Sequence, residues 1–381
     1  MILENLNIIN YRNIAQAELS FSPKVNCFVG ANGMGKTNVL DAIYYLSFCK
    51  SALSAQDAPN IRHGEEFFML QGDYKDDEGV CLKVHCGVKA GQRKRIKRDD
   101  KEVKRVTEHI GQIPLVLISP ADSMLITGGS EERRRFMDMV ISQNEIPYLE
   151  AVMRYNKALQ QRNALLKQEA EPDASVMDVL EEMMSLDAEL IYNRRKAFVE
   201  EFVPIFSEIY SELCNNSCEQ PGVDYVSHGA RGPLAPQLRE LRVKERIVGY
   251  SLHGVHKDDL NLTFNGYALK REGSQGQSKT YFIAMKLAQY VFLRRKGHQR
   301  TPLLLLDDIF DKLDAGRVER IVSYVSGTEF GQLFITDTNR EHTSRILAEA
   351  GHDYRLFTLQ SGEILLSAKP DQISGHEKES V

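Results

Sequence analysis

The chain has 381 residues, of which 42% are hydrophobic and 27% charged, with 26 glycines and 12 prolines. This composition is close to average soluble usage and excludes disordered, collagen-like and disulfide-scaffold proteins, while the length predicts two domains or one large domain with an insertion. The formal net charge of -5 gives no overall attraction for nucleic acid, so any such site must be a local cluster.

No stretch of the sequence is long and apolar enough to span a membrane. The longest strongly apolar run is Leu303 to Leu306, whereas a span needs roughly 18–20 apolar residues. The N-terminal sequence MILENLNIINYRN lacks the pattern of a signal peptide, so a cytoplasmic protein with no membrane partner is expected. The cysteines at 27, 49, 81, 86, 214 and 218 form no CxxC pair, which predicts reduced and mostly buried thiols.

The first third of the chain predicts strands around one helix. Strands are expected over 2–9, 17–21 and 25–29, and the last of them leads through a glycine loop into a helix over 38–46. Alternating segments at 68–70, 80–88 and 115–118, separated by turn residues, predict an antiparallel meander beside the first strands.

Residues 93–105 (RKRIKRDDKEVKR) carry eight basic and three acidic side chains. They predict a hairpin with its turn at Asp99 and Asp100. A solvated hairpin and a surface that contacts phosphates are equally good interpretations of this segment on its own.

From about Glu131 to Asn215 the composition favours helices. Three helices are expected, with an interruption at residues 171–173 and a further break or kink at Pro204. The apolar positions hold no strict heptad repeat, so the helices are expected to form a bundle and not a coiled coil. Residues 216–250 predict only a helix over 236–246.

The last third predicts alternating strands and helices. Strands are expected at 251, 260–264, 303–307 and 332–336, helices at 277–296, 315–326 and 341–350, and two strands before a disordered tail after Pro370.

The loop before the first helix has the pattern GxxxxGK[ST]. Its glycines allow backbone N–H groups to surround phosphate oxygens at a helix N-terminus, where the helix dipole also favours negative charge. Lys36 is predicted to reach the β- and γ-phosphates, and the Thr37 hydroxyl to bind Mg²⁺. The predicted nucleotide-binding residues are Gly30, Ala31, Asn32, Gly33, Met34, Gly35, Lys36, Thr37 and Asn38.

The apolar strand at 303–306 ends in Asp307 and Asp308. Carboxylates at the carboxyl end of a central strand are what a Mg²⁺-nucleotide site needs. Asp307 is therefore predicted to hold Mg²⁺, and Asp308 to orient or deprotonate the attacking water, with Asp308 and Lys36 as the catalytic residues.

A short segment with a hydroxyl and a glycine stands at the start of the helix expected at 277–296. It consists of Ser274, Gln275, Gly276 and Gln277. At a helix N-terminus it predicts either a second phosphate contact, to a nucleotide held by another subunit, or simply an N-capped helix.

These motifs together resemble the ATP-binding-cassette (ABC) ATPases, and Asp311-Lys312-Leu313-Asp314 follows where that superfamily carries its D-loop. Asn38 after the loop threonine, and Tyr11-Arg12-Asn13 after the first strand, are similar to the SMC-like branch. The segments 119–122 (SPAD), 128–136 (GGSEERRRF) and 254–260 (GVHKDDL) narrow the resemblance to the RecF family of recombination and repair proteins.

The resemblance implies an α/β fold: an ABC/SMC-type P-loop ATPase head with an antiparallel β-meander and an inserted, mostly helical second lobe. It implies an ATPase lobe formed by 1–130 and 251–370, a helical lobe at 131–250 and a disordered tail at 371–381. It also implies a homodimer closed around two ATP molecules, each bound between the phosphate loop of one subunit and residues 274–277 of the other, with Asp314 in the D-loop.

The resemblance to this family implies that the chain acts in DNA replication and recombinational repair. The dimer would bind double- and single-stranded DNA near junctions and assist RecA loading with RecO and RecR. Its Mg²⁺-dependent ATPase would be weak and stimulated by DNA. The candidate DNA contacts are Arg93, Lys94, Arg95, Arg133, Arg134 and Arg135, although the arginines at 133–135 could instead pair with Glu131, Glu132 or Asp138.

Two departures from the superfamily suit slow hydrolysis. Residues 119–122, near the expected Q-loop, contain no glutamine, and Ile335-Thr336-Asp337-Thr338 stands where many cassette ATPases carry a switch histidine. Thr336 or Thr338 is a loose substitute.

Two other ABC-type proteins are alternatives. A transporter ATPase subunit shares the three motifs, but the 271 positions from Lys36 to Asp307 are too many for an ordinary one. A long-coil SMC protein would need hundreds of heptad residues in that interval.

Overall fold

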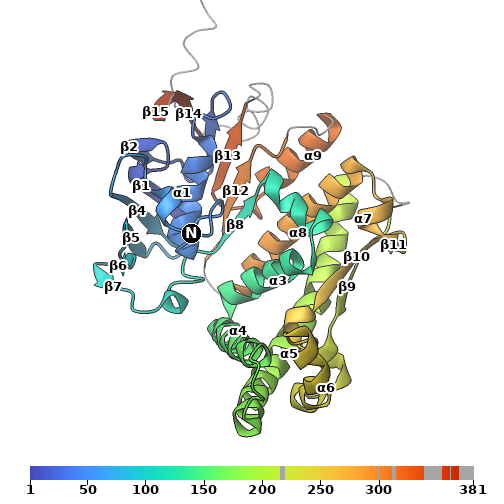
Figure 1. Ribbon diagram of the computed structural model, residues 1–381. Coiled ribbons are helices and arrows are strands. Elements are labelled where there is room, and N and C mark those ends of the chain that lie inside the picture. The colour runs from blue at the N-terminus through green and yellow to red at the C-terminus, as the bar shows by residue number, and fades with distance from the viewer. Residues whose placement is uncertain (215–218, 298–299, 311–314, 339–353, 361, 369–381) are drawn as a thin grey trace, which may run out of the picture. The chain divides into compact units, whose positions relative to one another are not determined.

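The computed structural model describes residues 1–214, 219–297, 300–310, 315–338, 354–360 and 362–368 (Figure 1). The chain divides into two compact units. Unit 1 comprises Met1–Asp122 with Gln289–Val381, and unit 2 comprises Ser123–Ala288. The sequence placed its lobe boundaries at 130/131 and 250/251, and the roles assigned to those lobes remain predictions.

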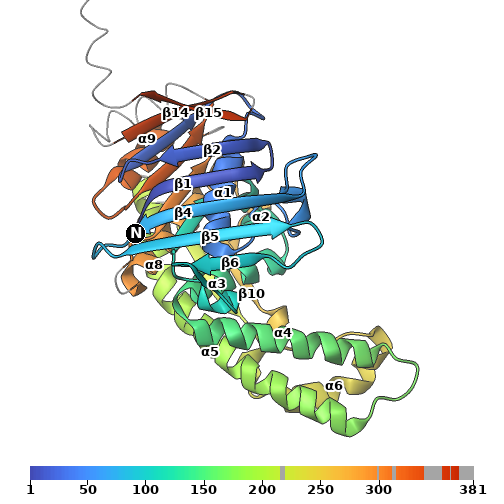
Figure 2. The same cartoon turned by 90° about the vertical axis from the view of Figure 1, so that its left-hand side faces the viewer.

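Unit 1 contains an antiparallel sheet of six strands in the order β2-β1-β4-β5-β6-β7, most of which Figure 2 shows side by side. The strands are β1 (Ile2–Tyr11), β2 (Ile14–Ser20), β4 (Phe67–Lys75), β5 (Cys81–Lys89), β6 (Arg95–Arg98) and β7 (Lys101–Glu102). Burial alternates along β4 and β5, so one face of the sheet packs on the core. The expected meander is confirmed for the segments at 68–70 and 80–88.

The expected hairpin is also confirmed. Strands β6 and β7 pair antiparallel, and Asp99 and Asp100 form the turn with φ of 48° and 63°. Two consecutive residues with positive φ match the twist of the flanking strands, and aspartate tolerates this region better than most side chains.

The second sheet of unit 1 has the order β15-β14-β3-β13-β12-β8. Its strands are β3 (Val25–Val29), β8 (Leu115–Ile118), β12 (Leu303–Asp307), β13 (Leu333–Asp337), β14 (Tyr354–Gln360) and β15 (Glu363–Ala368). Every pair is parallel except β14 with β15. Strands β12 and β13 are buried at every residue, as expected for a parallel sheet covered on both faces.

One strand was placed wrongly from the sequence. Residues 115–118 were expected in the meander, but β8 pairs in parallel with β12. The run Leu-Val-Leu-Ile is continuously apolar and mostly buried, which is typical of a central parallel strand and not of an alternating meander strand.

Helix α1 (Lys36–Phe48) contacts strands of both sheets. It is buried on almost every side, because one face meets the antiparallel sheet and another meets the parallel sheet. Unit 1 also contains α9 (Ala315–Ser326) and the short 3₁₀ turns η1 (Ala58–Asn60), η2 (Val106–Glu108) and η3 (Pro120–Ser123). The last residue of η3, Ser123, is the first residue of unit 2. The helix expected over 341–350 and the tail at 371–381 lie outside the described residues.

Unit 2 is mostly helical. Its helices are α2 (Met124–Thr127), α3 (Ser130–Asn144), α4 (Ile146–Leu166), α5 (Ala174–Cys214), α6 (Leu234–Val248) and α7 (Leu269–Glu272), and α8 (Gln275–Lys296) begins in it. The three helices expected over 131–215 are therefore confirmed. Of the break or kink predicted at Pro204, the break is wrong, because α5 runs through this residue. Glu200, whose carbonyl loses its usual N–H partner, is exposed, so water can replace that bond.

A small sheet of order β11-β10-β9 completes unit 2. It consists of β9 (Pro221–Val226), β10 (Asp259–Phe264) and β11 (Tyr267–Ala268), with the turns η4 (His228–Arg231) and η5 (Val255–Lys257). Strand β9 was missed, since proline and glycine at its start are typical of a loop. The strand expected at Ser251 is wrong. The backbone N–H and the hydroxyl of Ser251 instead donate to Asn163 Oδ1 at 2.8 Å.

Among the described residues, no helix is long and apolar enough to cross a membrane. The described cysteines are free thiols, and Cys27, Cys49 and Cys86 are buried, in agreement with the expectation from the sequence.

Candidate nucleotide site and basic surfaces

The phosphate loop joins β3 to α1, and two of its glycines are required by their surroundings. Gly35 has φ of 106°, and a Cβ there would lie 2.7 Å from Asn13 Oδ1. A Cβ on Gly30 would lie 2.7 Å from the carbonyl oxygen of Leu359 in β14. The approach to the β14 backbone requires glycine at position 30, and the positive φ requires it at position 35.

The loop ends at the N-terminus of α1, where the helix dipole favours the negative charge of phosphates. Among the described residues no side chain caps this end, and its first turn contains no acidic residue. The Lys36 ammonium donates to the Gly30 carbonyl at 2.9 Å and lies 3.9 Å from Asp308 Oδ2. Backbone donors, the helix dipole and a lysine therefore converge on one loop, as the binding of a nucleotide's phosphates requires.

The turn after β1 supports the loop from outside. Asn38 Nδ2 donates to Asn13 Oδ1 at 2.7 Å, and Asn13 also lies against Gly35. The adjacent Asp41 is buried in α1 and accepts hydrogen bonds from the Tyr11 hydroxyl at 2.7 Å and Arg12 Nε at 3.1 Å. Asp41 was not among the residues predicted for the site. The only signal was a carboxylate within an otherwise apolar helix.

Asp307 lies at the carboxyl end of β12 and is nearly buried. Its Oδ1 accepts hydrogen bonds from Thr37 Oγ1 at 2.9 Å and Thr336 Oγ1 at 2.7 Å. Burial raises the pKa of Asp307 above its ordinary value, while the hydrogen bonds from Thr336 and Thr37 act in the opposite direction.

Thr37 and Asp307 fit a Mg²⁺ ion in their chemistry. A hydroxyl and a carboxylate oxygen 2.9 Å apart are adjacent hard donors. Mg²⁺ commonly takes only one or two protein oxygens and completes its octahedron with phosphates and waters. The pair therefore suits a metal that arrives with a nucleotide.

Asp308 follows with φ of 44°, an unusual backbone conformation for a residue other than glycine. Its backbone N–H donates to Thr336 Oγ1 at 3.0 Å. The Thr336 hydroxyl therefore links the Asp307 carboxylate to the backbone of Asp308, and it is completely buried. Of the two threonines considered from the sequence, the structure places Thr336 at the carboxylates, whereas Thr338 is exposed.

Residues 274–277 lie in unit 2 and form a reciprocal cap at the start of α8. Gln277 N donates to Ser274 Oγ at 3.2 Å, and Ser274 N donates to Gln277 Oε1 at 2.9 Å. Ser274 and Gln275 remain exposed, so the cap leaves this surface accessible. The D-loop residue Asp314 lies outside the described residues.

The arginines at 133–135 have partners within unit 2. Arg133 forms a two-bond ion pair with Asp259, at 2.6 and 3.0 Å, and Arg134 donates to the Asp258 carbonyl at 2.7 Å. Arg135 approaches two glutamates on its own helix at 3.4–3.5 Å, as the sequence allowed, and its side chain is 58% exposed. The segments 128–136 and 254–260 are thus brought together by an ion pair and a hydrogen bond.

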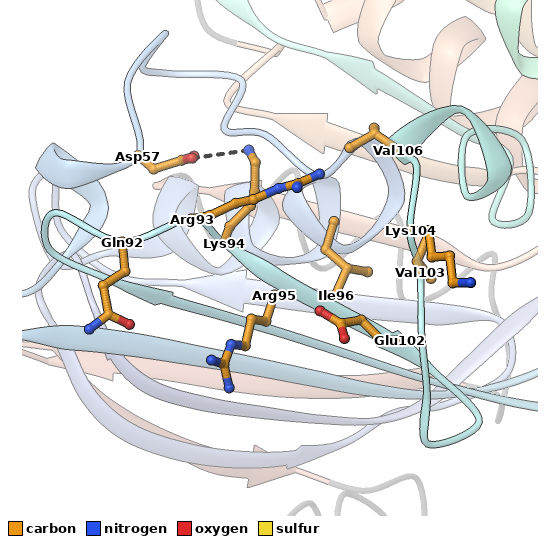
Figure 3. A pocket seen from close by; sticks show the side chains of 10 residues that line it. All are labelled: Asp57, Gln92, Arg93, Lys94, Arg95, Ile96, Glu102, Val103, Lys104 and Val106. Carbon is orange, nitrogen blue, oxygen red and sulfur yellow. Dashed lines mark ion pairs between the residues drawn. The ribbon is translucent and has the colours of Figure 1, made fainter.

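The basic hairpin in unit 1 borders a groove of about 710 Å³ (Figure 3). Lys94 Nζ forms an ion pair with Asp57 at 3.0 Å and donates to the Cys49 carbonyl at 2.6 Å. Arg93 and Arg95 are exposed. The three adjacent basic residues therefore differ in their environment, which their sequence did not indicate.

A family model and full-length relatives of this chain point to the same family. Residues 2–362 match the family model described as the RecF/RecN/SMC N terminal domain. The DNA replication and repair protein RecF of Phocaeicola vulgatus is 55% identical over 364 residues, covering 96% of this chain and 98% of that protein. The RecF of Porphyromonas gingivalis is 50% identical over 365 residues, covering 96% of this chain and all of its own.

Solved structures of similar fold agree with the family indicated by the sequence relatives. The recombination mediator protein RecF bound to ATP, in the RecFOR pathway, superimposes with a TM-score of 0.85 at 27% identity, covering 96% of this chain and 98% of that one. A head domain of Smc bound to the C-terminal winged-helix domain of ScpA has a TM-score of 0.60 at 15% identity, covering 98% of this chain and all of that one. The second likeness shows the fold alone.

Proposed function

Because the chain belongs to the RecF family of ABC-type ATPases, we propose that it is an ATP-dependent DNA-binding protein of replication and recombinational repair. One observation carries the proposal. Lys36 and Thr37 of the phosphate loop meet Asp307 and Asp308 at the carboxyl end of the parallel sheet. This arrangement is what binding and hydrolysis of a nucleoside triphosphate require.

In the proposed reaction, the phosphate loop binds the triphosphate and Lys36 neutralises charge on its β- and γ-oxygens. Thr37 and Asp307 would hold Mg²⁺, which supplies further charge neutralisation on the phosphate oxygens. Asp308 orients a water and accepts its proton as the water oxygen bonds to the γ-phosphorus and the bond to the β-γ bridging oxygen breaks.

The expected hydrolysis is slow. Thr336 hydrogen-bonds to the Asp307 carboxylate and to the Asp308 backbone N–H, but a threonine hydroxyl cannot act as a base in the way a switch histidine can. The segment at 119–122 offers no glutamine to sense the γ-phosphate. A weak ATPase that DNA stimulates suits a protein whose ATP-bound state must persist on DNA.

Two ATP molecules would join two subunits. Residues 274–277 present an exposed helix N-terminus, and the proposed partner is the nucleotide bound by another subunit's phosphate loop. We assign Asp314 to the same dimer contact, by its place after the acidic motif.

Ser274→Arg is expected to prevent ATP-induced dimerisation, because a bulky side chain would occupy the position of the partner's phosphates. Light scattering with Mg·ATP measures the result. Ser274→Thr is the control, since it keeps the helix cap and the small side chain. A dimer formed normally by Ser274→Arg would refute the shared nucleotide site.

The dimer is proposed to bind double- and single-stranded DNA near gaps, and to assist RecA loading with RecO and RecR. Support comes from the RecF family and from the solved relative, a recombination mediator of the RecFOR pathway. The candidate DNA contacts stay Arg93, Lys94, Arg95, Arg133, Arg134 and Arg135. Of these, Arg93, Arg95 and Arg135 are exposed. The alternative of a transporter ATPase subunit gains no support from the family match.

Hydrolysis assays with gapped DNA test this function. We expect slow phosphate release that requires Mg²⁺, stops on chelation and rises when gapped DNA is added. A protein that hydrolyses ATP equally well without the metal, or that never responds to DNA, would contradict the proposal.

Thr336→Val is expected to lower the turnover number about 5- to 150-fold, because losing a buried hydrogen bond costs about 1–3 kcal/mol and the hydroxyl positions both the Asp307 carboxylate and the Asp308 backbone. ATP affinity should change little, since Lys36 and the loop are unaltered. Thr336→Ser restores the hydroxyl and should recover most of the activity. If valine and serine behave alike, the hydroxyl has no positioning role.

A further inference from the structure

The groove beside the basic hairpin is lined by residues 92–96, which lead into the hairpin, and by residues 102–106, which follow its turn (Figure 3). It has a volume of about 710 Å³ and is entirely within unit 1. The lining residues are Asp57, Gln92, Arg93, Lys94, Arg95, Ile96, Glu102, Val103, Lys104 and Val106. Four are cationic and two are anionic, so the groove has a positive excess that the chain as a whole lacks.

One of the four cations is already used by the fold. Lys94 turns toward Asp57 in Figure 3, and their charged atoms are 3.0 Å apart. The same ammonium donates to the Cys49 carbonyl at the end of α1 and lies 5.5 Å from the centre of the Tyr45 ring. The Tyr45 hydroxyl in turn donates to Asp57 at 2.6 Å. A cation at a helix C-terminus is stabilised there by the helix dipole, so Lys94 fastens the hairpin to α1.

The other three cations are available. Arg93, Arg95 and Lys104 are exposed, and none makes an ion pair or a side-chain hydrogen bond within the part of the chain that the structure describes. Only Glu102 opposes them among the lining carboxylates once Asp57 has paired with Lys94. Their donors can therefore reach a ligand without breaking existing contacts.

The chemistry of the groove favours a phosphate backbone over bases. Between the cations lie Ile96, Val103 and Val106, and none of the described lining residues is aromatic. Without an aromatic platform, bases have no surface on which to stack. Contacts from lysine and arginine to phosphates position a nucleic acid without reading its sequence.

We propose that Arg93, Arg95 and Lys104 form a sequence-independent site for the DNA backbone, and that Lys94 is a positioning residue which does not contact DNA. The inference rests on the proposed DNA-binding function. It adds Lys104 to the candidate contacts, removes Lys94 from them, and assigns the site to a groove of one unit.

The test measures binding of the whole protein, with Mg·ATP, to fluorescent oligo(dT) and to a duplex of the same length. Arg93→Ala, Arg95→Ala and Lys104→Ala should each weaken binding several-fold. Each should lower the slope of log affinity against log salt by about 0.7 for the single strand or about 0.9 for the duplex. Lys101→Ala is the matched control. It removes the same charge from an exposed residue of the same hairpin that does not line the groove.

Lys94→Met separates positioning from contact, because it keeps the aliphatic stem and removes the charge. We expect an unchanged salt slope and a lower melting temperature for this variant. A salt slope reduced as much as in Arg93→Ala would overturn the assignment of Lys94. Equal effects of Lys101→Ala and Lys104→Ala would show that only local charge matters and would overturn the groove.

The outcomes also separate this inference from the function on which it rests. If the wild-type protein binds both DNA probes but the three groove variants bind as well as it does, the groove assignment alone is wrong. If the wild-type protein binds neither probe, the proposed function fails and the groove assignment fails with it.

Discussion

Lys36→Ala is expected to weaken Mg·ATP binding about 10- to 150-fold. The ammonium lies over the phosphate loop, 2.9 Å from the Gly30 carbonyl, where the β- and γ-phosphates are expected. A hydrogen bond between charged groups contributes about 1.5–3 kcal/mol, and every 1.4 kcal/mol is a factor of about ten in affinity. The neutral alanine also leaves the triphosphate charge without its nearest protein cation.

Titration calorimetry measures this effect directly. Lys24→Ala is a suitable control, because Lys24 is an exposed lysine of the same unit, outside the loop. Thermal melting of the variant without nucleotide shows whether the fold is retained. A Lys36→Ala protein that is folded and binds Mg·ATP as tightly as the wild type would show that the phosphate-loop assignment is wrong.

Asp308→Asn is expected to reduce the rate of ATP hydrolysis about 10²- to 10⁴-fold, the usual contribution of a positioned general base. Asparagine keeps the shape of the side chain but cannot accept the proton of the attacking water. It also tolerates the positive φ of this position. Nucleotide binding should persist, so ATP is expected to hold the variant as a long-lived dimer.

Phosphate release and light scattering together measure this outcome. The control is Asp337→Asn, which alters the neighbouring carboxylate at the end of β13 and leaves the acids of β12 intact. An Asp308→Asn protein that hydrolyses ATP at the wild-type rate would exclude Asp308 as the base. One that turns over slowly but fails to dimerise would separate hydrolysis from assembly.

Most of the fold that positions the site could be predicted from the sequence. The strand at 25–29, the helix after it and the apolar strand at 303–307 are strong local patterns, and they place Lys36 and Asp307 at the same edge of one sheet. The errors have local causes too. The run at 115–118 resembles any short apolar strand, and only its pairing with β12 decides its sheet.

The role of Thr336 could not be predicted with the same certainty. It depends on the register of two strands, in which Asp307 stands opposite Thr336. A shift of one residue would turn the hydroxyl away from the acids, because side chains alternate along a strand. Local sequence patterns do not fix such a register between strands that lie far apart in the chain.

The basic residues illustrate the same limit. The partners of Arg133 and Arg134 are 126 and 124 residues away in sequence, so their ion pair and hydrogen bond could not be inferred from neighbouring letters. In the hairpin, Arg93 and Lys94 are consecutive, yet one is exposed and the other binds Asp57. A cluster of basic residues in the sequence predicts a positively charged surface, but only the fold shows which of these side chains already have an ion-pair partner.

In the proposed function, ATP assembles two copies of this chain on DNA. Sedimentation of the wild-type protein with a gapped duplex, with and without Mg·ATP, tests it most directly. We predict two protomers on each DNA molecule when Mg·ATP is present, and no stable complex without nucleotide. A single protomer bound equally well in both conditions would contradict the claim.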